Sequence, residues 1–390
     1  MSGLVSCPNR TVPEAPTVDQ VFGYCSRTIV DTASCLWPGD DVRLVEHVPS
    51  VTGYVHRIEV AGAELYAKTS ILGASLVSVL RGRRGQWASV REAQRRYLHD
   101  PDNLLRRECD QLRLMGGFGW SGSVRAKYRT GVLITEPAEG RSLSEIARVE
   151  PYRLGGLLVQ VWALLDHLRR REPNEQLQVI SERDIYCTFA RKFSGDPSRL
   201  VARLGLAERP DRVVTGLRRA AGLVRRLPEP QPGTAVVYGD LKPEHVIVDG
   251  AGTMRVIDPG IMRGHPVVDA GKIVSRLLVS LFCLPPHGAR DHAVVDAIDG
   301  FLDRLAGAVP AIDRGAWWRD LVALWLRDTL NILSTYLAAP ADLPLPDHGV
   351  TMIDHAKQVC VLVGDIATTL AENPDPVVAW RRGVAGVISR

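Results

Sequence analysis

Hydrophobic and polar positions alternate along the early part of the chain. From residue 42 to 70, runs such as V-R-L-V-E-H-V and Y-V-H-R-I-E-V are separated by the turns P-S-V-T-G and A-G-A. Alternation with a period of two is typical of half-buried strands. The apolar run G-V-L-I-T, which ends before residue 136, predicts one further strand. The pattern therefore predicts a small antiparallel sheet in this part of the chain.

The rest of the chain has the apolar spacing of helices. Residues 76–115 are expected to be helical and strongly basic, and Ser142 or Ser144 is expected to cap the helix that follows it. Short helical pieces broken by Pro and Gly are expected at 195–235. Longer helices are expected at 151–171, 267–284, 291–308, 313–338, 350–372 and 375–388.

This order of elements predicts an α+β fold with two lobes. Residues 1–40 are rich in Pro, Thr and Ser and are expected to form an irregular arm. A sheet lobe is expected at 41–137, and a mostly helical lobe at 138–390.

The composition is that of an ordinary globular protein. The 390 residues are 45% hydrophobic and 24% charged, and the net charge of +4 does not indicate a nucleic-acid partner. The seven cysteines never form C-x-x-C, which favours a reducing compartment over disulfides or zinc. The N-terminus lacks a signal-peptide pattern, and Arg276 and Pro285 interrupt the most apolar stretch. We expect a soluble cytoplasmic protein without a membrane partner.

The segment 236–260 carries the candidate chemistry. Asp240 lies in a polar turn after one strand, and Asp258 ends a later strand eighteen positions on. Phosphoryl transfer needs one carboxylate near the attacking hydroxyl, one on Mg²⁺, and a cation on the nucleotide phosphates. Lys68, the only lysine in the first hundred residues, lies in a predicted strand and is the candidate cation. The alternative interpretation is that these are ordinary turn and strand residues.

Two motifs carry a resemblance to known kinases. The sequence Y-G-D-L-K-P-E-H at 238–245 resembles the catalytic loop H-R-D-L-K-P-E-N of protein kinases and the H-G-D-x-x-P-x-N loop of aminoglycoside phosphotransferases and choline kinases. The sequence V-I-D-P-G at 256–260 resembles their metal-binding segment. The resemblance covers roughly residues 45–285. It implies a protein-kinase-like two-lobed fold, ATP or GTP as the phosphoryl donor, and Mg²⁺.

The resemblance also implies roles for single residues. Asp240 would orient the acceptor hydroxyl and take its proton, with Lys242 near the γ-phosphate. Asp258 would hold Mg²⁺. Lys68 would bind the α- and β-phosphates and pair with a glutamate of the next helices, for which Glu108 is favoured over its rival Glu92.

The rest of the nucleotide site is expected on two connecting segments. Ser50, Thr52 and the Gly53 backbone would contact phosphates from the loop 49–54, unless this loop is an ordinary hairpin. The adenine is expected against the connector from Glu136 to Gly140, because of its place in the order of the chain.

Several positions depart from the family pattern. His245 stands where such sites have an asparagine; its imidazole nitrogen is a possible metal ligand, as in the similar macrolide phosphotransferases. Tyr238 replaces a histidine and is expected to fill the same space. Asp269 is expected to cap the next helix and to support the metal loop. Only ten residues separate Asp258 from Asp269, so no activation segment is expected.

The acceptor stays open at this stage. A small hydroxylated molecule, such as an antibiotic or a biosynthetic intermediate, is the first hypothesis. A precursor peptide phosphorylated on Ser or Thr during ribosomal-peptide (lanthipeptide-type) maturation is the second, and a nucleotide-binding pseudokinase is the third, prompted by His245. Trp318, Trp325 and Tyr336 would line an acceptor pocket or belong to the core. The basic segment 81–107 would bind an anionic acceptor or acidic peptide, or form a solvated face.

Overall fold

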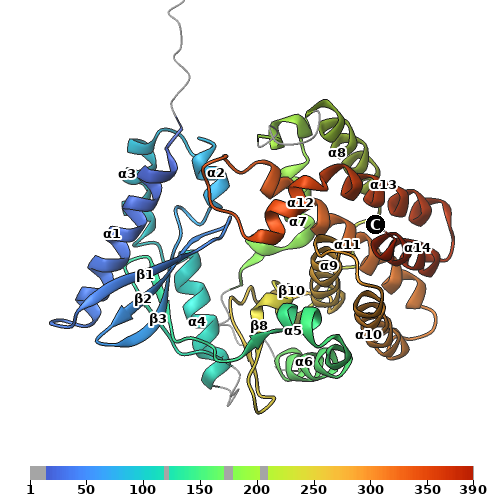
Figure 1. Cartoon of the computed structure of the whole chain (residues 1–390), viewed down its shortest axis with the longest axis horizontal. Helices are drawn as coiled ribbons and strands as arrows, with labels where there is room; N and C mark the ends of the chain where they lie inside the picture. Colours follow the sequence, from blue (N-terminus) through green and yellow to red (C-terminus); the bar gives the residue numbers. More distant parts are fainter. Residues whose placement is uncertain (1–14, 118–122, 171–178, 203–209, 390) are drawn as a thin grey trace, which may run out of the picture.

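The structure is a computed structural model that describes residues 15–117, 123–170, 179–202 and 210–389. Its elements form two lobes, one built on an antiparallel sheet and one built mostly of helices (Figure 1). The predicted α+β, protein-kinase-like architecture is therefore confirmed. In the described part of the chain, no helix is long and apolar enough to cross a membrane.

The first lobe contains a five-stranded antiparallel sheet with the order β1-β2-β3-β5-β4. On β2 every second residue is buried, as the alternating pattern predicts. On β3, the side chains of Ala67 and Lys68 point to opposite faces of the sheet. The strands are β1 (Val42–Val48), β2 (Tyr54–Val60), β3 (Ala63–Thr69), β4 (Ala126–Arg129) and β5 (Val132–Thr135).

A long helix, α1 (Val18–Leu36), packs against the sheet on the face of Tyr54 and Ala67. Thr17 and Gln20 form a capping box at its start, each side chain bonding the backbone N–H of the other. One stripe of the helix is buried, and the hydroxyl groups of Ser26 and Tyr54 are 2.7 Å apart. The buried stripe contains Val18, Val21, Cys25, Ile29 and Ala33.

The prediction of an irregular arm over residues 1–40 is therefore wrong for residues 18–36. The capping box and the four-residue spacing of apolar side chains favour a helix more strongly than the Pro, Thr and Ser content opposes one. Residues 1–14 of the predicted arm lie outside the described residues.

The basic segment 81–107 is not one helix. It contains a turn after α2 (Leu76–Leu80), then α3 (Trp87–Tyr97), a second turn, and the start of α4 (Leu104–Gly117). Gly82 and Gly85 both have positive φ, a backbone conformation that a continuous helix does not contain.

The second lobe is mostly helical, with short strands set into it. The paired strands β6 (Arg141–Ser142), β8 (Val246–Val248) and β9 (Met254–Val256) form one small sheet, and β7 (Ala235–Val237) and β10 (Met262–Gly264) form another. Ser142 caps α5 by accepting a hydrogen bond from the Glu145 N–H, as one of the two predicted alternatives. The helices are α5 (Leu143–Val149), α6 (Leu154–Arg169), α7 (Ile185–Lys192), α8 (Pro210–Arg225), α9 (Val267–Cys283), α10 (Gly288–Gly307), α11 (Arg314–Leu337), α12 (Asp347–Asp354), α13 (Ala356–Glu372) and α14 (Pro376–Ile388).

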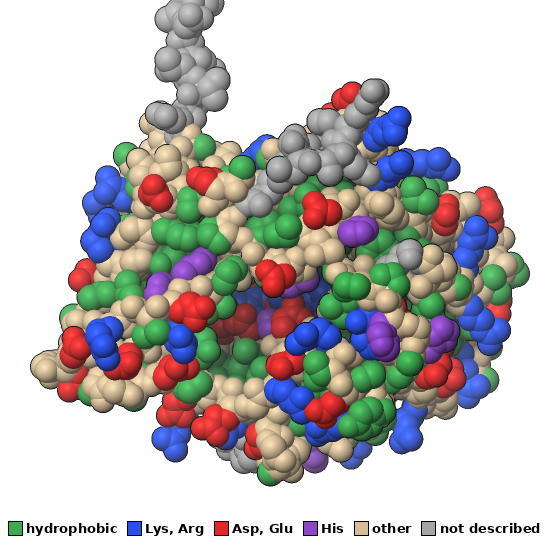
Figure 2. Space-filling model, viewed as in Figure 1, with side chains coloured by type: hydrophobic (Ala, Val, Ile, Leu, Met, Phe, Trp, Pro, Cys, Tyr) green, Lys and Arg blue, Asp and Glu red, His purple; other side chains and the backbone are tan. Residues whose placement is uncertain are grey.

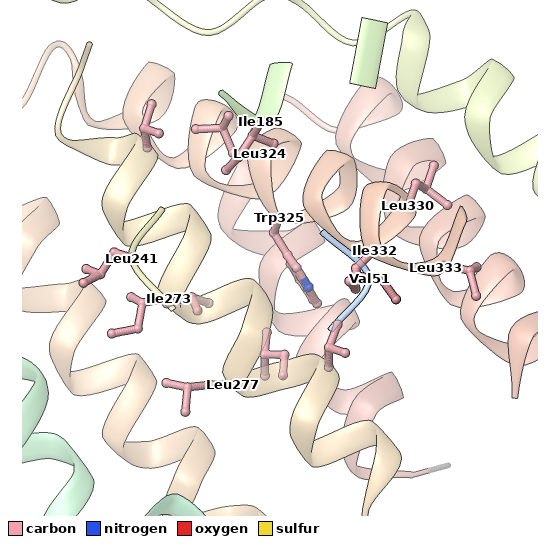
Figure 3. Packing of buried hydrophobic residues seen from close by; sticks show 14 of the residues in the cluster. Val51, Ile185, Leu241, Ile273, Leu277, Leu324, Trp325, Leu330, Ile332 and Leu333 are labelled. Atoms are coloured by element: carbon pink, nitrogen blue, oxygen red, sulfur yellow. The ribbon is translucent and has the colours of Figure 1, made fainter. Parts of the chain in front are cut away.

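The core of this lobe surrounds α9 and α11, both of which are buried along most of their length (Figure 3). Trp318 and Trp325 pack against Trp380 of α14, in a tilted and an edge-to-face arrangement, with ring centroids 5.9 and 5.3 Å away. Trp318, Trp325 and Tyr336 are all at most 7% exposed, and none of them lines the cavity between the lobes. The acceptor-pocket interpretation of these residues is wrong; they belong to the core.

Candidate active site

A cavity of about 590 Å³ lies between the two lobes. Figure 2 shows a hollow at this place, in which basic, acidic and histidine side chains gather. Of the ten candidate site residues, six line the cavity and four do not. The six are Thr52, Gly53, Lys68, Asp240, Lys242 and Asp258; the others are Ser50, Glu108, Glu136 and His245.

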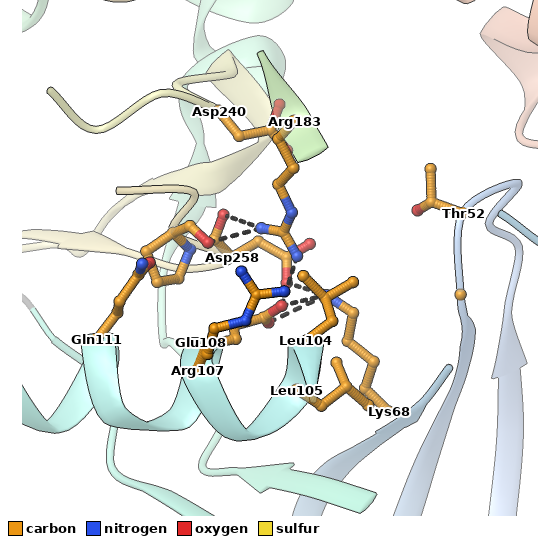
Figure 4. A network of polar contacts seen from close by, with 12 residues as sticks. Thr52, Lys68, Leu104, Leu105, Arg107, Glu108, Gln111, Arg183, Asp240 and Asp258 are labelled. Atoms are coloured by element: carbon orange, nitrogen blue, oxygen red, sulfur yellow. Dashed lines mark hydrogen bonds and ion pairs between the residues drawn. The ribbon is translucent and has the colours of Figure 1, made fainter. Parts of the chain in front are cut away.

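Lys68 of β3 and Glu108 of α4 form the expected pair at the base of the cavity. The Lys68 Nζ lies 3.0 and 3.1 Å from the two carboxylate oxygens of Glu108, which is 1% exposed (Figure 4). The rival Glu92 pairs with Arg95 on the exposed side of α3. Burial raises the pKa of Glu108 to about 7, and Lys68 and Arg183 oppose that rise. The charge of Glu108 therefore depends on its two cations.

Arg183 is a member of the site that the sequence does not reveal. It precedes α7, pairs with Glu108, and donates hydrogen bonds to the backbone oxygens of Asp258 and Pro259 at 2.9 and 2.6 Å. Gln111 of α4 bonds both backbone groups of Ile261, at 2.9 and 3.1 Å. These contacts fix the segment around Asp258 relative to α4. No local motif marks Arg183, because it acts through residues far away in the sequence.

Asp258 is one of the residues that join the two lobes. Its carboxylate contacts Lys68, and its backbone has φ of 59°, in the left-handed region that non-glycine residues seldom adopt. Burial alone would raise the pKa of Asp258, but the cations Lys68 and Arg183 hold it well below its usual range. Asp258 is therefore ionised, in a strained backbone position of the kind found at functional sites.

His245 lies behind Asp258, with its Nε2 3.6 Å from the Asp258 Oδ2. Burial, together with the charge of Lys242, lowers the pKa of His245 to about 4, so the ring is neutral. Its Nδ1 is 3.2 Å from the Asp240 carbonyl oxygen, which only accepts hydrogen bonds, so Nδ1 carries the proton. The Nε2 lone pair therefore faces the carboxylate.

This arrangement fits a divalent cation. Asp258 offers a carboxylate oxygen, and the unprotonated Nε2 of His245 lies close enough to share one ion with it. Among the described residues, no group of three or more His, Cys, Asp and Glu side chains could hold a metal. Mg²⁺ commonly uses one or two protein ligands and completes its shell with substrate phosphates and water, so a pair is sufficient.

Asp240 is held by two lysines. Its Oδ2 lies 3.0 Å from the Lys242 Nζ and its Oδ1 lies 3.2 Å from the Lys272 Nζ. Lys272 also contacts Asp328 of α11 at 2.8 Å, and Arg276 pairs with Asp328 as well. Burial alone would raise the pKa of Asp240, but the lysines hold it well below its usual range. Asp240 is thus ionised and a weak base.

Asp269 supports the loop that carries Asp240. It accepts hydrogen bonds from the N–H groups of Tyr238 and Gly239 at 3.1 and 2.8 Å. The prediction that Asp269 caps α9 is wrong, because the N-cap is Pro266 and Asp269 lies in the first turn. Its structural role is instead the anchoring of the 238–240 loop. Tyr238 is fully buried and donates to the Ile257 oxygen at 2.7 Å, so it fills the space beneath the loop as expected.

The loop 49–54 presents part of the expected phosphate site. The Ser50 hydroxyl accepts long hydrogen bonds of 3.3 and 3.4 Å from the N–H groups of Thr52 and Gly53. Ser50 therefore shapes the loop, whereas Thr52 and Gly53 face the cavity. In Figure 4, Thr52 lies across the gap from Asp258.

Glu136 does not reach the cavity. Its side chain is 49% exposed and points to Arg125, and its N–H donates to the Arg125 carbonyl at 3.1 Å. The N–H of Glu136 is thus not available to an adenine ring. Contact of a base with the rest of the connector 136–140 stays a prediction.

Comparisons with known proteins support the fold. No protein-family model and no curated protein matches the sequence. The solved structure of the amicoumacin kinase hAmiN with AMP-PNP and Ca²⁺ is 13% identical, covers 88% of this chain and 96% of its own, and has a TM-score of 0.52. Aminoglycoside phosphotransferase APH(4)-Ia with AMP-PNP and hygromycin B is 12% identical over 87% of this chain and 98% of its own, with a TM-score of 0.47. Choline kinase LicA from Streptococcus pneumoniae is 12% identical over 87% and 99%, with a TM-score of 0.44. The likeness to hAmiN, whose TM-score is above 0.5, shows that this chain has the protein-kinase-like fold of that kinase.

Proposed function

We propose that this chain, folded like the aminoglycoside phosphotransferases and choline kinases, transfers the γ-phosphoryl group of ATP or GTP to a hydroxyl of a small molecule, such as an antibiotic or a biosynthetic intermediate. The observation that carries this proposal is the meeting of Lys68, Glu108 and Asp258 from three separate segments, with Asp240 on the same cavity. The small acceptors named for the solved neighbours support it.

In this proposal Asp240 orients the acceptor hydroxyl. The hydroxyl oxygen forms a bond to the γ-phosphorus, the bond from that phosphorus to the bridging oxygen breaks, and the nucleoside diphosphate leaves. The hydroxyl proton passes to Asp240. A weak base is adequate, because the transition state is loose and catalysis depends mainly on position and charge. Lys242, 3.0 Å from Asp240, is placed to accompany the transferred group.

Lys68, Asp258 and His245 would serve the nucleotide. Lys68 contacts both Glu108 and Asp258, and phosphates entering the cavity would replace the contact with Asp258. Asp258 and His245 would then hold the divalent cation. Mg²⁺, when bound there, supplies positive charge to the β- and γ-phosphates. The Gly53 backbone and the Thr52 hydroxyl would contact the phosphates from the loop 49–54 of the first lobe.

The experiment that tests the proposal measures ADP formation from ATP by the full chain with Mg²⁺, with water as the default acceptor. We expect slow turnover by the wild type and a loss of at least about 100-fold in Asp258→Asn. Asp365→Asn, on the exposed side of α13, is the matched control and should retain the wild-type rate. Binding of AMP-PNP without turnover under several divalent metals and acceptors would contradict the proposal and indicate a pseudokinase.

A further inference from the structure

The end of the cavity beyond Asp240 is strongly basic. Lys242, Lys272, Lys192 and Asn331 follow one another there: Lys242 and Lys272 contact Asp240, and Lys192 donates to the Asn331 oxygen at 2.6 Å. This end contains two carboxylates and seven basic side chains. They are Asp240 and Asp328, against Arg83, Arg84, Arg191, Lys192, Lys242, Lys272 and Arg276.

These two carboxylates neutralise only part of this charge, together with Glu244, which lies outside the cavity lining and whose charge acts on Lys242 and Arg276. Asp240 and Asp328 pair with Lys242, Lys272 and Arg276. The remaining four basic side chains form no ion pair with an acidic side chain in the described part of the chain. They are Arg83, Arg84, Arg191 and Lys192.

These four bases come from opposite walls that touch each other. Arg81, in the turn after α2, donates to the Arg199 oxygen, and Arg199 donates to the Lys192 oxygen, both at 3.2 Å. The charges of Arg199 and Arg81 act on Arg83, and burial together with these charges lowers its pKa. The turn at 81–86 therefore lies beside the end of α7, and Arg83 and Arg84 line the same cavity as Lys192.

The Lys192 ammonium group can donate a hydrogen bond to one further acceptor atom. It is half-buried on α7, and two of its three N–H groups are used by the Asn331 carbonyl and the Thr335 hydroxyl. Neither of these partners is charged. Burial, with Arg276 and Arg191, lowers the pKa of Lys192 to about 7, and an anion beside the amine would raise it again.

We propose that the acceptor carries an anionic group, a carboxylate or a phosphate, in addition to its hydroxyl, and that Lys192, with Arg83 and Arg191, binds that group. This inference rests on the proposed phosphotransfer. Excess positive charge in a partly enclosed cleft attracts anions and repels ammonium groups. The cavity of about 590 Å³ also contains the nucleotide end, so the space that remains fits a small molecule, with the hydroxyl at Asp240 and the anionic group at Lys192.

The test uses sulfate as the probe and the full chain saturated with AMP-PNP and Mg²⁺, so that the nucleotide phosphates fill their own site. The rise in Tm with sodium sulfate is compared with sodium chloride at equal ionic strength. We expect Lys192→Met to weaken sulfate binding by about tenfold or more, since it removes a charge-assisted hydrogen bond. Arg83→Gln and Arg191→Gln, at exposed positions, should each weaken it by about threefold.

Arg219→Gln on the exposed side of α8 is the matched control and should leave the sulfate response unchanged. Malonate in place of sulfate distinguishes a carboxylate site from a phosphate site, and a response to either one supports the proposal. The same response in wild type, Lys192→Met and Arg83→Gln would overturn it, as would stabilisation by choline or an aminoglycoside in place of both anions. If a peptide of Ser and Glu binds far more tightly than malonate, the acceptor is an acidic peptide and the small-molecule proposal is wrong.

This measurement is independent of turnover. If the chain forms ADP but its sulfate response does not depend on Lys192, the charge inference alone fails. If sulfate binds through Lys192 and no ADP forms, the proposed phosphotransfer alone fails.

Discussion

The two ends of the cavity differ in how their charges are balanced. At the nucleotide end, Lys68 contacts Glu108 and Asp258, and Arg183 pairs with the same Glu108. At the acceptor end, Lys192 is bonded only to neutral groups, and Arg83 has no acidic partner among the described residues. One end is a closed network of ion pairs, and the other has positive charge in excess.

The difference separates two tasks. At the balanced end, the phosphates of the donor nucleotide are the same in every turnover, so the side chains that contact them need fixed positions. A network of buried ion pairs fixes those side chains. The unbalanced end adds a preference for the sign of the acceptor's charge. Substitutions at the first end should therefore affect every reaction, and substitutions at the second should affect the choice of acceptor.

The largest expected effect follows from Lys68→Met. The substitution removes the cation that contacts the buried carboxylate of Glu108 and the partly exposed carboxylate of Asp258, and ADP formation should fall by at least about 100-fold. The rate is measured by ADP release under saturating ATP and Mg²⁺. Lys127→Met, on β4 of the same sheet, is the control and should retain the rate. Equal losses in both variants would contradict the ion-pair network as the cause.

A smaller effect, on stability, is expected for Asp269→Ala. The substitution leaves the buried N–H groups of Tyr238 and Gly239 unpaired and removes the ion pair with Arg169. The free energy of unfolding should fall by about 3 kcal/mol, measured by urea denaturation. Asp365→Ala is the exposed control. An unchanged midpoint for Asp269→Ala would mean that this carboxylate does not hold the 238–240 loop.

His245→Asn tests the metal assignment at the nucleotide end. An amide oxygen suits Mg²⁺ better than an imidazole nitrogen does, whereas Co²⁺ and Zn²⁺ accept nitrogen readily. The ratio of ADP formation with Mg²⁺ to that with Co²⁺ should rise by about threefold or more in the variant. If the ratio does not change, His245 is not a ligand, and its neutral ring serves only to pack behind Asp258.

The smallest effect is the pH dependence of stability at the acceptor end. The pKa of Lys192 is about 7 in the folded chain, below its ordinary value of 10.5, because of burial and the charges of Arg276, Arg191 and Lys272, which Asp328 opposes. Below pH 7 Lys192 is protonated in both the folded and the unfolded chain, and burying its charge destabilises the folded chain by the full amount. Between pH 7 and 10.5 only the unfolded chain keeps the proton, so this destabilisation disappears as the pH rises.

Lys192→Met removes that cost. The Tm of the variant relative to wild type should consequently be higher at pH 7 than at pH 10. Lys357→Met, at an exposed position, serves as the control and should show no such trend. A difference in Tm that stays constant from pH 7 to pH 10 would contradict the lowered pKa.

Local motifs made the nucleotide end predictable. Asp258 and His245, with Asp240 and Lys242 where the two ends meet, lie in one short segment whose motifs resemble those of kinases. The pairing of Lys68 with Glu108 follows from the same resemblance. Arg183 was not predictable, because it reaches Glu108 from a short 3-10 helix, Ser181–Arg183, 75 positions later. The acceptor end is assembled from the turn after α2, from α7, α9 and α11, and no sequence spacing records that assembly.

Elsewhere, single features decided the outcome. Helix α1 begins at a capping box of Thr17 and Gln20, a local signal that outweighs the Pro, Thr and Ser content of the segment. Trp318 and Trp325 have a spacing that fits a pocket and a core equally well, and only the position of Trp380 from a distant helix places them in the core.

The most direct test of the central claim is a single-turnover measurement of γ-phosphoryl transfer by Asp240→Asn, combined with its affinity for AMP-PNP. The substitution keeps the shape of the side chain and removes the charge that Lys242 and Lys272 contact. We predict a rate at least about 100-fold below that of wild type, with AMP-PNP affinity within about threefold. A variant that transfers the phosphoryl group at the wild-type rate would contradict the assignment of Asp240 and, with it, the proposed function.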